Sequence, residues 1–194
     1  TLTAGESITL PWSPSARVGY VAIEGGFDVP RILGGRGTLL SIGAGGFRGR
    51  PLRKGDVLPL GAPTNKPAEN VEAVLSRRSF TLVPCADFVD LEERVAALLT
   101  RNLRVAHSSD RTGVRLIPDP ALGVTGPSVS RASTPLVRGC VQLTPENEFI
   151  VMGPDHPITG GYPLVGYVPA AELEALFAVT PGASLQLTLH HPSK

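Results

Sequence analysis

The segment Pro181-Gly182-Ala183-Ser184-Leu185-Gln186-Leu187 places a glycine turn directly before apolar residues that alternate with polar ones. A period of two puts every second side chain on the same face, which is the pattern of a half-buried β-strand. The same order recurs at Lys54-Gly55-Asp56-Val57-Leu58-Pro59-Leu60 and over residues 1–10. Three turn-strand units of this kind favour a mainly β protein whose sheet closes into a barrel.

The composition also favours short strands joined by turns. The 194 residues include 22 glycines and 19 prolines, and 42% of the chain is hydrophobic while 18% is charged. Such a chain can bury a core, and its glycine and proline content argues against long helical bundles. We therefore expect a folded chain of one domain or two small ones.

Two helices are expected among the strands. Apolar residues recur at helical spacing from Phe88 to Leu99, after Asp87 as a candidate N-cap, and Pro169 can open a second helix that ends before Pro181. The strands are expected at residues 18–23, 37–42, 79–83, 103–106, 139–143, 149–151 and 165–168.

A polar, proline-rich run from Gly61 to Pro67 has the composition of a linker. It predicts a partial N-terminal barrel-like subdomain over residues 1–62, a linker over residues 63–78, and a β-barrel with two helices over residues 79–194.

The charge balance bears on the partners of the chain. With 18 Lys and Arg against 17 Asp and Glu, the net charge of +1 attracts neither nucleic acid nor an anionic membrane surface. No apolar run approaches the roughly 20 residues of a membrane-spanning helix, and the first residues lack a signal pattern. We expect a cytoplasmic protein with no nucleic-acid or membrane partner.

Metal and nucleotide signatures are missing from the sequence. The spacing of Cys85, Cys140 and the four histidines is not that of a metal site. The glycine-rich segment Gly43–Gly49 runs into Pro51 instead of opening a helix, as a phosphate-binding loop would. We therefore expect neither a metal nor a cofactor bound by this chain.

One candidate site lies directly after the strand expected to end at Ala106. Ser109, Asp110, Arg111 and Gly113 bring together a hydroxyl, a carboxylate and a guanidinium, which can bind a carboxylate or an amide. The simpler interpretation is a turn in which Asp110 and Arg111 cap the strand.

A second candidate site is the segment from Asp155 to Pro163. Gly160 and Gly161 can expose amide groups that, with Thr159 and Tyr162, orient a small polar substrate, and His156 beside Asp155 can act as an acid–base pair. The simpler interpretation is a structural turn with Tyr162 packed inside and a surface histidine.

Seven ordered motifs give the chain a family resemblance. Taken together they resemble the allophanate hydrolase subunit 2 family, which includes the C subunit of 5-oxoprolinase and the biotin-dependent carboxyltransferase part of urea carboxylase. The motifs are Glu24–Pro30, Leu33–Thr38, Gly45–Leu52, Lys54–Leu60, Ser109–Leu116, Gly139–Leu143 and Asp155–Pro163.

The resemblance implies a cyclophilin-like β-barrel, a partner similar to allophanate hydrolase subunit 1, and a small amide substrate. The activity it implies is ATP-dependent opening of 5-oxoproline to glutamate by the complex, or carboxyl transfer from carboxybiotin to urea. The residues expected in the site are Asp110, Arg111, Asp155 and His156 for catalysis, and Ser109, Gly113, Thr159, Gly160, Gly161 and Tyr162 for substrate binding.

Two departures from the family pattern support a third function. Leu164 stands where the family usually has lysine, and His156-Pro157-Ile158 replaces its usual Arg-Gln-Thr. The chain is then a non-catalytic regulatory subunit that binds its subunit 1-like, kinase-inhibitor-like partner.

Overall fold

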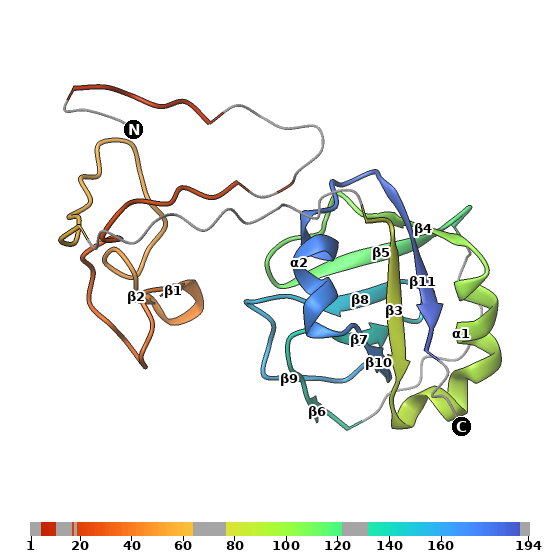
Figure 1. The fold of residues 1–194 in the computed structure, drawn as a ribbon. Coiled ribbons are helices and arrows are strands. Elements are labelled where there is room, and N and C mark those ends of the chain that lie inside the picture. The colour runs from red at the N-terminus through yellow and green to blue at the C-terminus, as the bar shows by residue number, and fades with distance from the viewer. Residues whose placement is uncertain (1–4, 11–16, 18, 64–76, 122–131, 191–194) are drawn as a thin grey trace. The chain divides into compact units, whose positions relative to one another are not determined.

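The computed structural model describes residues 5–10, 17, 19–63, 77–121 and 132–190 (Figure 1). The chain divides into two compact units. The larger unit consists of Thr1–Gly19 and Ala73–Lys194, and the smaller unit of Tyr20–Glu72.

The larger unit contains a closed barrel of seven strands in the order β10-β3-β11-β4-β5-β8-β7. Neighbouring strands are antiparallel except for β11 and β3, which are parallel. The prediction of a mainly β chain with a barrel is therefore confirmed. The strands are β3 Ser79–Pro84, β4 Asn102–Val105, β5 Gly113–Asp119, β7 Cys140–Leu143, β8 Phe149–Met152, β10 Leu164–Tyr167 and β11 Ser184–Leu189.

The period-two pattern of the segment after Pro181 is realised in β11. Leu185 and Leu187 are each 2% exposed, whereas the alternate residues Ser184, Gln186 and Thr188 are exposed. Leu187 lies opposite Phe80 of β3 in the parallel register. Together with Val141 and Leu143 of β7 and Phe149 and Val151 of β8, these side chains belong to one apolar core.

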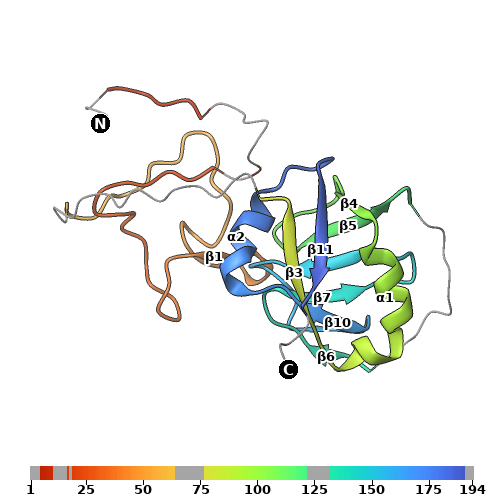
Figure 2. The same ribbon diagram turned by 45° about the vertical axis from the view of Figure 1, so that its right-hand side comes forward.

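Both predicted helices are present (Figures 1 and 2). The helix α1 Glu92–Leu99 buries Val95 and Leu98 and contacts β11, and α2 Ala170–Ala178 buries Leu173 and Leu176 and contacts β3. Each therefore supplies an apolar face to the barrel core.

The start of the first helical segment differs from the prediction. Residues Ala86–Leu91 form a 3-10 helix, η2, whose N-cap is Cys85, so Asp87 is not a helix cap. Its Oδ2 instead accepts a hydrogen bond of 2.9 Å from the backbone N–H of Leu164 in β10. The carboxylate is used for a tertiary contact, which the local pattern does not reveal.

The smaller unit holds less regular structure than its sequence predicts. It contains β1 Thr38–Leu39, the 3-10 helix η1 Leu40–Ile42 and β2 Ala44–Gly45, with isolated bridges that join Phe27 to Leu60 and Ile32 to Gly35. Residues 19–23, which lie in the predicted strand 18–23, form no strand. After the turn at Lys54–Gly55, only Leu60 forms a β-bridge. Residues 6–10 of the larger unit are not a strand either, while residues 1–4 lie outside the described part. An alternating segment becomes a strand only where a second strand supplies its hydrogen bonds.

Candidate functional site

An ion pair joins the two polar loops that the sequence singles out. Nε of Arg111 donates to Oδ2 of Asp155 at 2.7 Å, and its Nη2 donates to Oδ1 at 3.0 Å. The side chains are 69% and 30% exposed, so solutes can reach the pair. Residues from the loop before β5 and the loop after β8 therefore meet at one end of the barrel.

The pairing of β5 with β8 brings these loops together. Gly113 lies opposite Met152, and the ladder continues past the strand ends, where the N–H of Gly153 donates to Thr112 O at 2.8 Å and that of Asp155 to Arg111 O at 3.0 Å. A β-carbon on Gly153 would collide with the carbonyl oxygen of Arg111. Only glycine permits this close approach of the two backbones.

Asp110 shapes the first loop. Its Oδ1 accepts hydrogen bonds from the backbone N–H groups of Thr112 at 2.8 Å and Gly113 at 3.2 Å. Oγ of Ser109 accepts another from the N–H of Arg115 at 3.0 Å. The simpler interpretation of a turn therefore describes Asp110, while Arg111 reaches across to the other loop. Catalysis by Asp110 and binding by Ser109 and Gly113 stay predictions.

The second loop is anchored by a buried amide that the sequence analysis did not single out. Thr159–Gly160 forms β9, which pairs with β6 Thr134–Pro135. A β-carbon on Gly160 would lie 2.6 Å from Nε2 of Gln142, and this atom donates to Tyr162 O at 3.0 Å. Gln142 is 3% exposed. A glutamine within a buried strand was therefore the sequence signal that could have indicated this contact.

Tyr162 differs from the simpler interpretation of this loop, and His156 differs from the acid–base pair expected with Asp155. The Tyr162 side chain is not packed inside, because the residue is 44% exposed. Nδ1 of His156 donates to Pro157 O at 2.8 Å, which leaves Nε2 as the ring atom that can accept a proton. The Asp155 carboxylate pairs with Arg111 and not with His156. Substrate binding by Thr159, Gly160, Gly161 and Tyr162 stays a prediction.

Arg17 is an additional cation close to the first loop. Burial lowers the pKa of its guanidinium, and the nearby Asp110 carboxylate offsets part of this effect. The backbone N–H of Arg17 donates to Ala178 O at 3.1 Å, and its Nη1 is buried with no hydrogen-bond partner in the described part of the chain. Nothing in the sequence pattern around Arg17 marks this position.

Within the described residues, no three His, Cys, Asp or Glu side chains gather in a way that suits a metal ion. In the same residues, no helix combines the length and the apolar surface that crossing a membrane requires.

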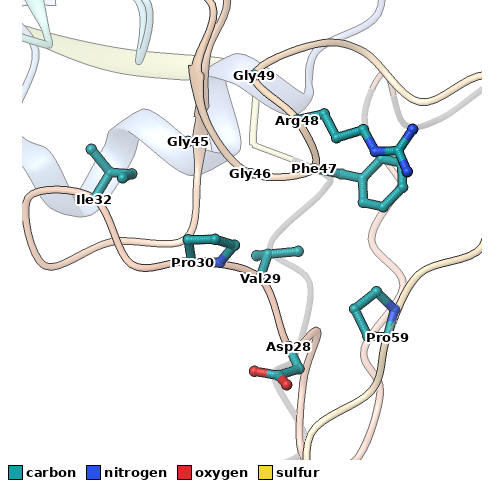
Figure 3. A pocket seen from close by; sticks show the side chains of 10 residues that line it. All are labelled: Asp28, Val29, Pro30, Ile32, Gly45, Gly46, Phe47, Arg48, Gly49 and Pro59. Atoms are coloured by element: carbon teal, nitrogen blue, oxygen red, sulfur yellow. The ribbon is translucent and has the colours of Figure 1, made fainter.

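The smaller unit contains a pocket of about 360 Å³ (Figure 3). No site is predicted here from the sequence, because the glycine-rich segment Gly43–Gly49 lacks the helix of a nucleotide-binding loop. The pocket is lined by Asp28, Val29, Pro30, Ile32, Gly45, Gly46, Phe47, Arg48, Gly49 and Pro59.

The barrel places the chain in a known structural class, that of carboxyltransferase-like domains. The structure is similar to the crystal structure of the K. lactis urea amidolyase, with a TM-score of 0.66 and 28% identity over 86% of this chain and 12% of that one. The model of the carboxyltransferase domain family, subdomain A and B, matches residues 1–189. The chain belongs to this family.

Relatives confirm the resemblance that the motifs predicted. The chain is 28% identical over 184 residues to the C subunit of the Escherichia coli 5-oxoprolinase, a match that covers 93% of this chain and 59% of that protein. It is 32% identical over 194 residues to the urea amidolyase of Lachancea kluyveri, covering 86% of this chain and 10% of that protein. The chain thus spans less than two thirds of the length of either relative.

Proposed function

We propose that this chain is part of an enzyme complex that opens 5-oxoproline to glutamate at the expense of ATP. The observation that carries the proposal is the bidentate ion pair between Arg111 and Asp155, which joins two glycine-containing polar loops at one accessible end of the barrel. The extent of the match to the 5-oxoprolinase relative supports this substrate over others.

The groups at this end of the barrel suit a small amide that carries a carboxylate. Nη1 of Arg17, which has no partner among the described residues, supplies a hydrogen-bond donor to an anionic oxygen. Nε2 of His156 accepts or returns a proton as the amide bond opens. The backbone hydrogen bonds of Gly153 and Asp155 hold the two loops in register. The ion pair restrains the Arg111 side chain, so that its donors stay aligned with the substrate.

The rest of the complex completes the reaction. A subunit 1-like protein is the expected partner, and we assign ATP turnover to the remainder of the complex, since the segment Gly43–Gly49 does not open a helix. The residues of this chain bind and orient the amide.

A second candidate function is carboxyl transfer from carboxybiotin to urea. The 32% identity to the Lachancea kluyveri urea amidolyase favours it. In that case the amide at the barrel loops is urea, and the biotin is carried by another domain or chain.

The test is turnover by the reconstituted complex. This chain is co-purified with its subunit 1-like partner and the other subunits, and 5-oxoproline and ATP are added while glutamate and ADP are measured. We expect glutamate and ADP to form together only when this chain is present. Carboxylation of urea from bicarbonate, with no glutamate formed, would replace the first function by the second. A stable complex with neither activity would contradict both and leave the regulatory role.

A further inference from the structure

We propose that the pocket of the smaller unit binds a small organic carboxylate with an apolar body. This proposal concerns residues 28–59 and does not depend on the proposed function, which rests on the loops of the larger unit. The volume of about 360 Å³ lies in the range of small-molecule sites in proteins.

The walls of the pocket are mainly apolar and are held by the backbone. Val29, Pro30, Ile32 and Pro59 contribute hydrocarbon surface (Figure 3). The backbone N–H of Asp28 donates to Pro59 O at 2.8 Å, and Nε of Arg36 donates to Val29 O at 3.2 Å. Since these bonds tie the walls together, the cavity is formed before a ligand enters.

Arg48 supplies the positive charge. Its guanidinium carbon lies 5.1 Å from the centroid of the Phe47 ring, a cation–π contact that restrains the side chain (Figure 3). Arg50 lies 5.4 Å from the same ring, but its charge is engaged by the Asp56 carboxylate at 2.8 and 2.7 Å. Arg48 makes no ion pair within the described residues. Arg48 and Asp28 are the two charged side chains of the lining, and Arg48 is the one that can pair with an anionic ligand.

The backbone of Arg48 is strained. Its φ of 58° lies in the left-handed region, which glycine adopts freely and arginine does not. Glycines fill neighbouring left-handed positions, at Gly46 with φ 52° and Gly49 with φ 66°. If the segment served only as a turn, glycine would be more favourable than arginine at position 48. An observed backbone outlier in a pocket lining points to a role for that side chain.

The same turn offers backbone donors. The N–H of Gly49 donates to Gly45 O at 2.9 Å and closes the turn. The amides of Gly46, Phe47 and Arg48 donate none of the hydrogen bonds found in the described part of the chain, although Gly46 is buried. Buried backbone N–H groups are rarely left without an acceptor, and successive amides in a glycine turn form a concave site for anions.

The charge of the whole segment is also positive. Residues 20–63 carry six Lys and Arg against three Asp and Glu, whereas the net charge of the complete chain is only +1. This local excess raises the concentration of small anions near the pocket. The apolar walls, the restrained cation and the amides together select a carboxylate with an apolar body.

A titration of the 194-residue chain with three matched probes tests the proposal. Benzoate, benzamide and the benzylammonium ion share a flat ring and differ in charge, and each is added to the ¹⁵N-labelled chain up to about 10 mM while amide signals are followed by NMR. We expect benzoate to shift the signals of Gly46 and Gly49 saturably, benzamide to bind at least about tenfold more weakly, and benzylammonium to leave the signals in place. Equal binding of the three probes, or no saturable shift, would overturn the proposal.

Variants at Arg48 distinguish benzoate binding in the pocket from general electrostatic attraction to the chain. Arg48→Gln should weaken benzoate binding about tenfold, whereas Arg53→Gln, which removes the same charge outside the lining, should change it less than about twofold. If both variants weaken benzoate binding equally, the binding depends on the overall positive charge and not on a specific site, which would contradict the proposal.

The Arg48→Gly variant distinguishes a loss of benzoate binding from a loss of folding. Glycine relieves the backbone strain, so this variant should melt at the same temperature as the wild type or higher and yet lose benzoate binding. If Arg48→Gly binds benzoate as tightly as the wild type, the arginine has no role in recognition and the proposal fails.

Discussion

At the scale of single residues, the Asp56 carboxylate shows how a local hydrogen-bond set makes stability depend on pH. It accepts two hydrogen bonds from Arg50, at 2.8 and 2.7 Å, and a third from the backbone N–H of Arg53 at 2.7 Å. The bonds from Arg50 are the main cause that holds the pKa of Asp56 well below its usual range. Because the folded state favours the charged carboxylate, its stabilising effect is present above about pH 4 and is lost as the pH falls further.

This predicts a pH-dependent effect of Asp56→Asn. The variant should lower the melting temperature of the smaller unit near neutral pH, and the difference from the wild type should shrink progressively below about pH 4. Melting curves followed at the amide signals of residues 50–56 measure this difference. A difference that is the same at about pH 3 and about pH 7 would show that the carboxylate charge is not responsible.

Arg17 and Arg48 both have an unfavourable local structure, since Nη1 of Arg17 is buried without a described partner and the backbone of Arg48 has a positive φ. Such features persist where the rest of the structure enforces them, and they are found most often at binding sites. We propose that Arg17 donates a hydrogen bond to a ligand oxygen in the larger unit and that Arg48 does so in the pocket of the smaller unit.

At the scale of elements, a buried carboxylate connects helix α2 to strand β3. Glu172 accepts hydrogen bonds from the backbone N–H of Thr81 at 2.7 Å, from its Oγ1 at 2.9 Å and from Arg77 at 2.8 Å. Glu172→Ala leaves these donors without an acceptor and should cost about 2–4 kcal/mol of unfolding free energy. Glu172→Gln retains one acceptor oxygen and should cost less, as measured by urea unfolding. A cost below about 0.5 kcal/mol for the alanine variant would contradict the role of this contact.

The closure of the barrel depends on a glycine in β10. A β-carbon on Gly166 would lie 2.6 Å from both Cδ1 of Leu82 and Val83 O. Gly166→Ala should therefore destabilise the barrel by about 1–3 kcal/mol through overpacking. Gly37→Ala is the matched control, because a β-carbon there meets nothing within 4 Å. Equal urea midpoints for both variants would show that β10 can shift without cost.

Elements with a clear period and a partner could be predicted from the sequence. The alternation in 184–187 and the helical spacing after Pro169 appear as β11 and α2. Strand β5 was missed, because Gly113–Asp119 begins beside the polar motif and contains Pro118, both of which suggest a loop. Residues 19–23 and 56–59 alternate without forming strands, since strand formation requires a pairing partner that a local pattern cannot specify.

At the scale of the whole molecule, the candidate site depends on contacts that no local pattern encodes. The loop residue types were predictable, but the pairing of Arg111 with Asp155, 44 positions apart, follows from the register of β5 against β8. The pocket of the smaller unit was not predicted, because its ten lining residues come from segments 28–32, 45–49 and 59 and converge only in the folded unit. The family could be recognised from the sequence, because its ordered motifs can be identified without knowledge of the contacts in the fold.

We propose that the Arg111–Asp155 pair contributes to a site for an amide substrate. The matched control is the ion pair between Arg115 and Glu148, in which Nη1 lies 3.2 Å from Oε2. This pair also contains an arginine of the β5 region and is also accessible to solvent. Neither Arg111→Gln nor Arg115→Gln should change stability by more than about 1 kcal/mol, because surface ion pairs contribute little. The two variants therefore separate function from folding.

The deciding measurement is kcat/KM for glutamate formation from 5-oxoproline by complexes assembled with each variant. We predict a fall of at least about tenfold with Arg111→Gln and a change of less than about twofold with Arg115→Gln. An assembled Arg111→Gln complex that matches the wild-type rate would contradict the claim.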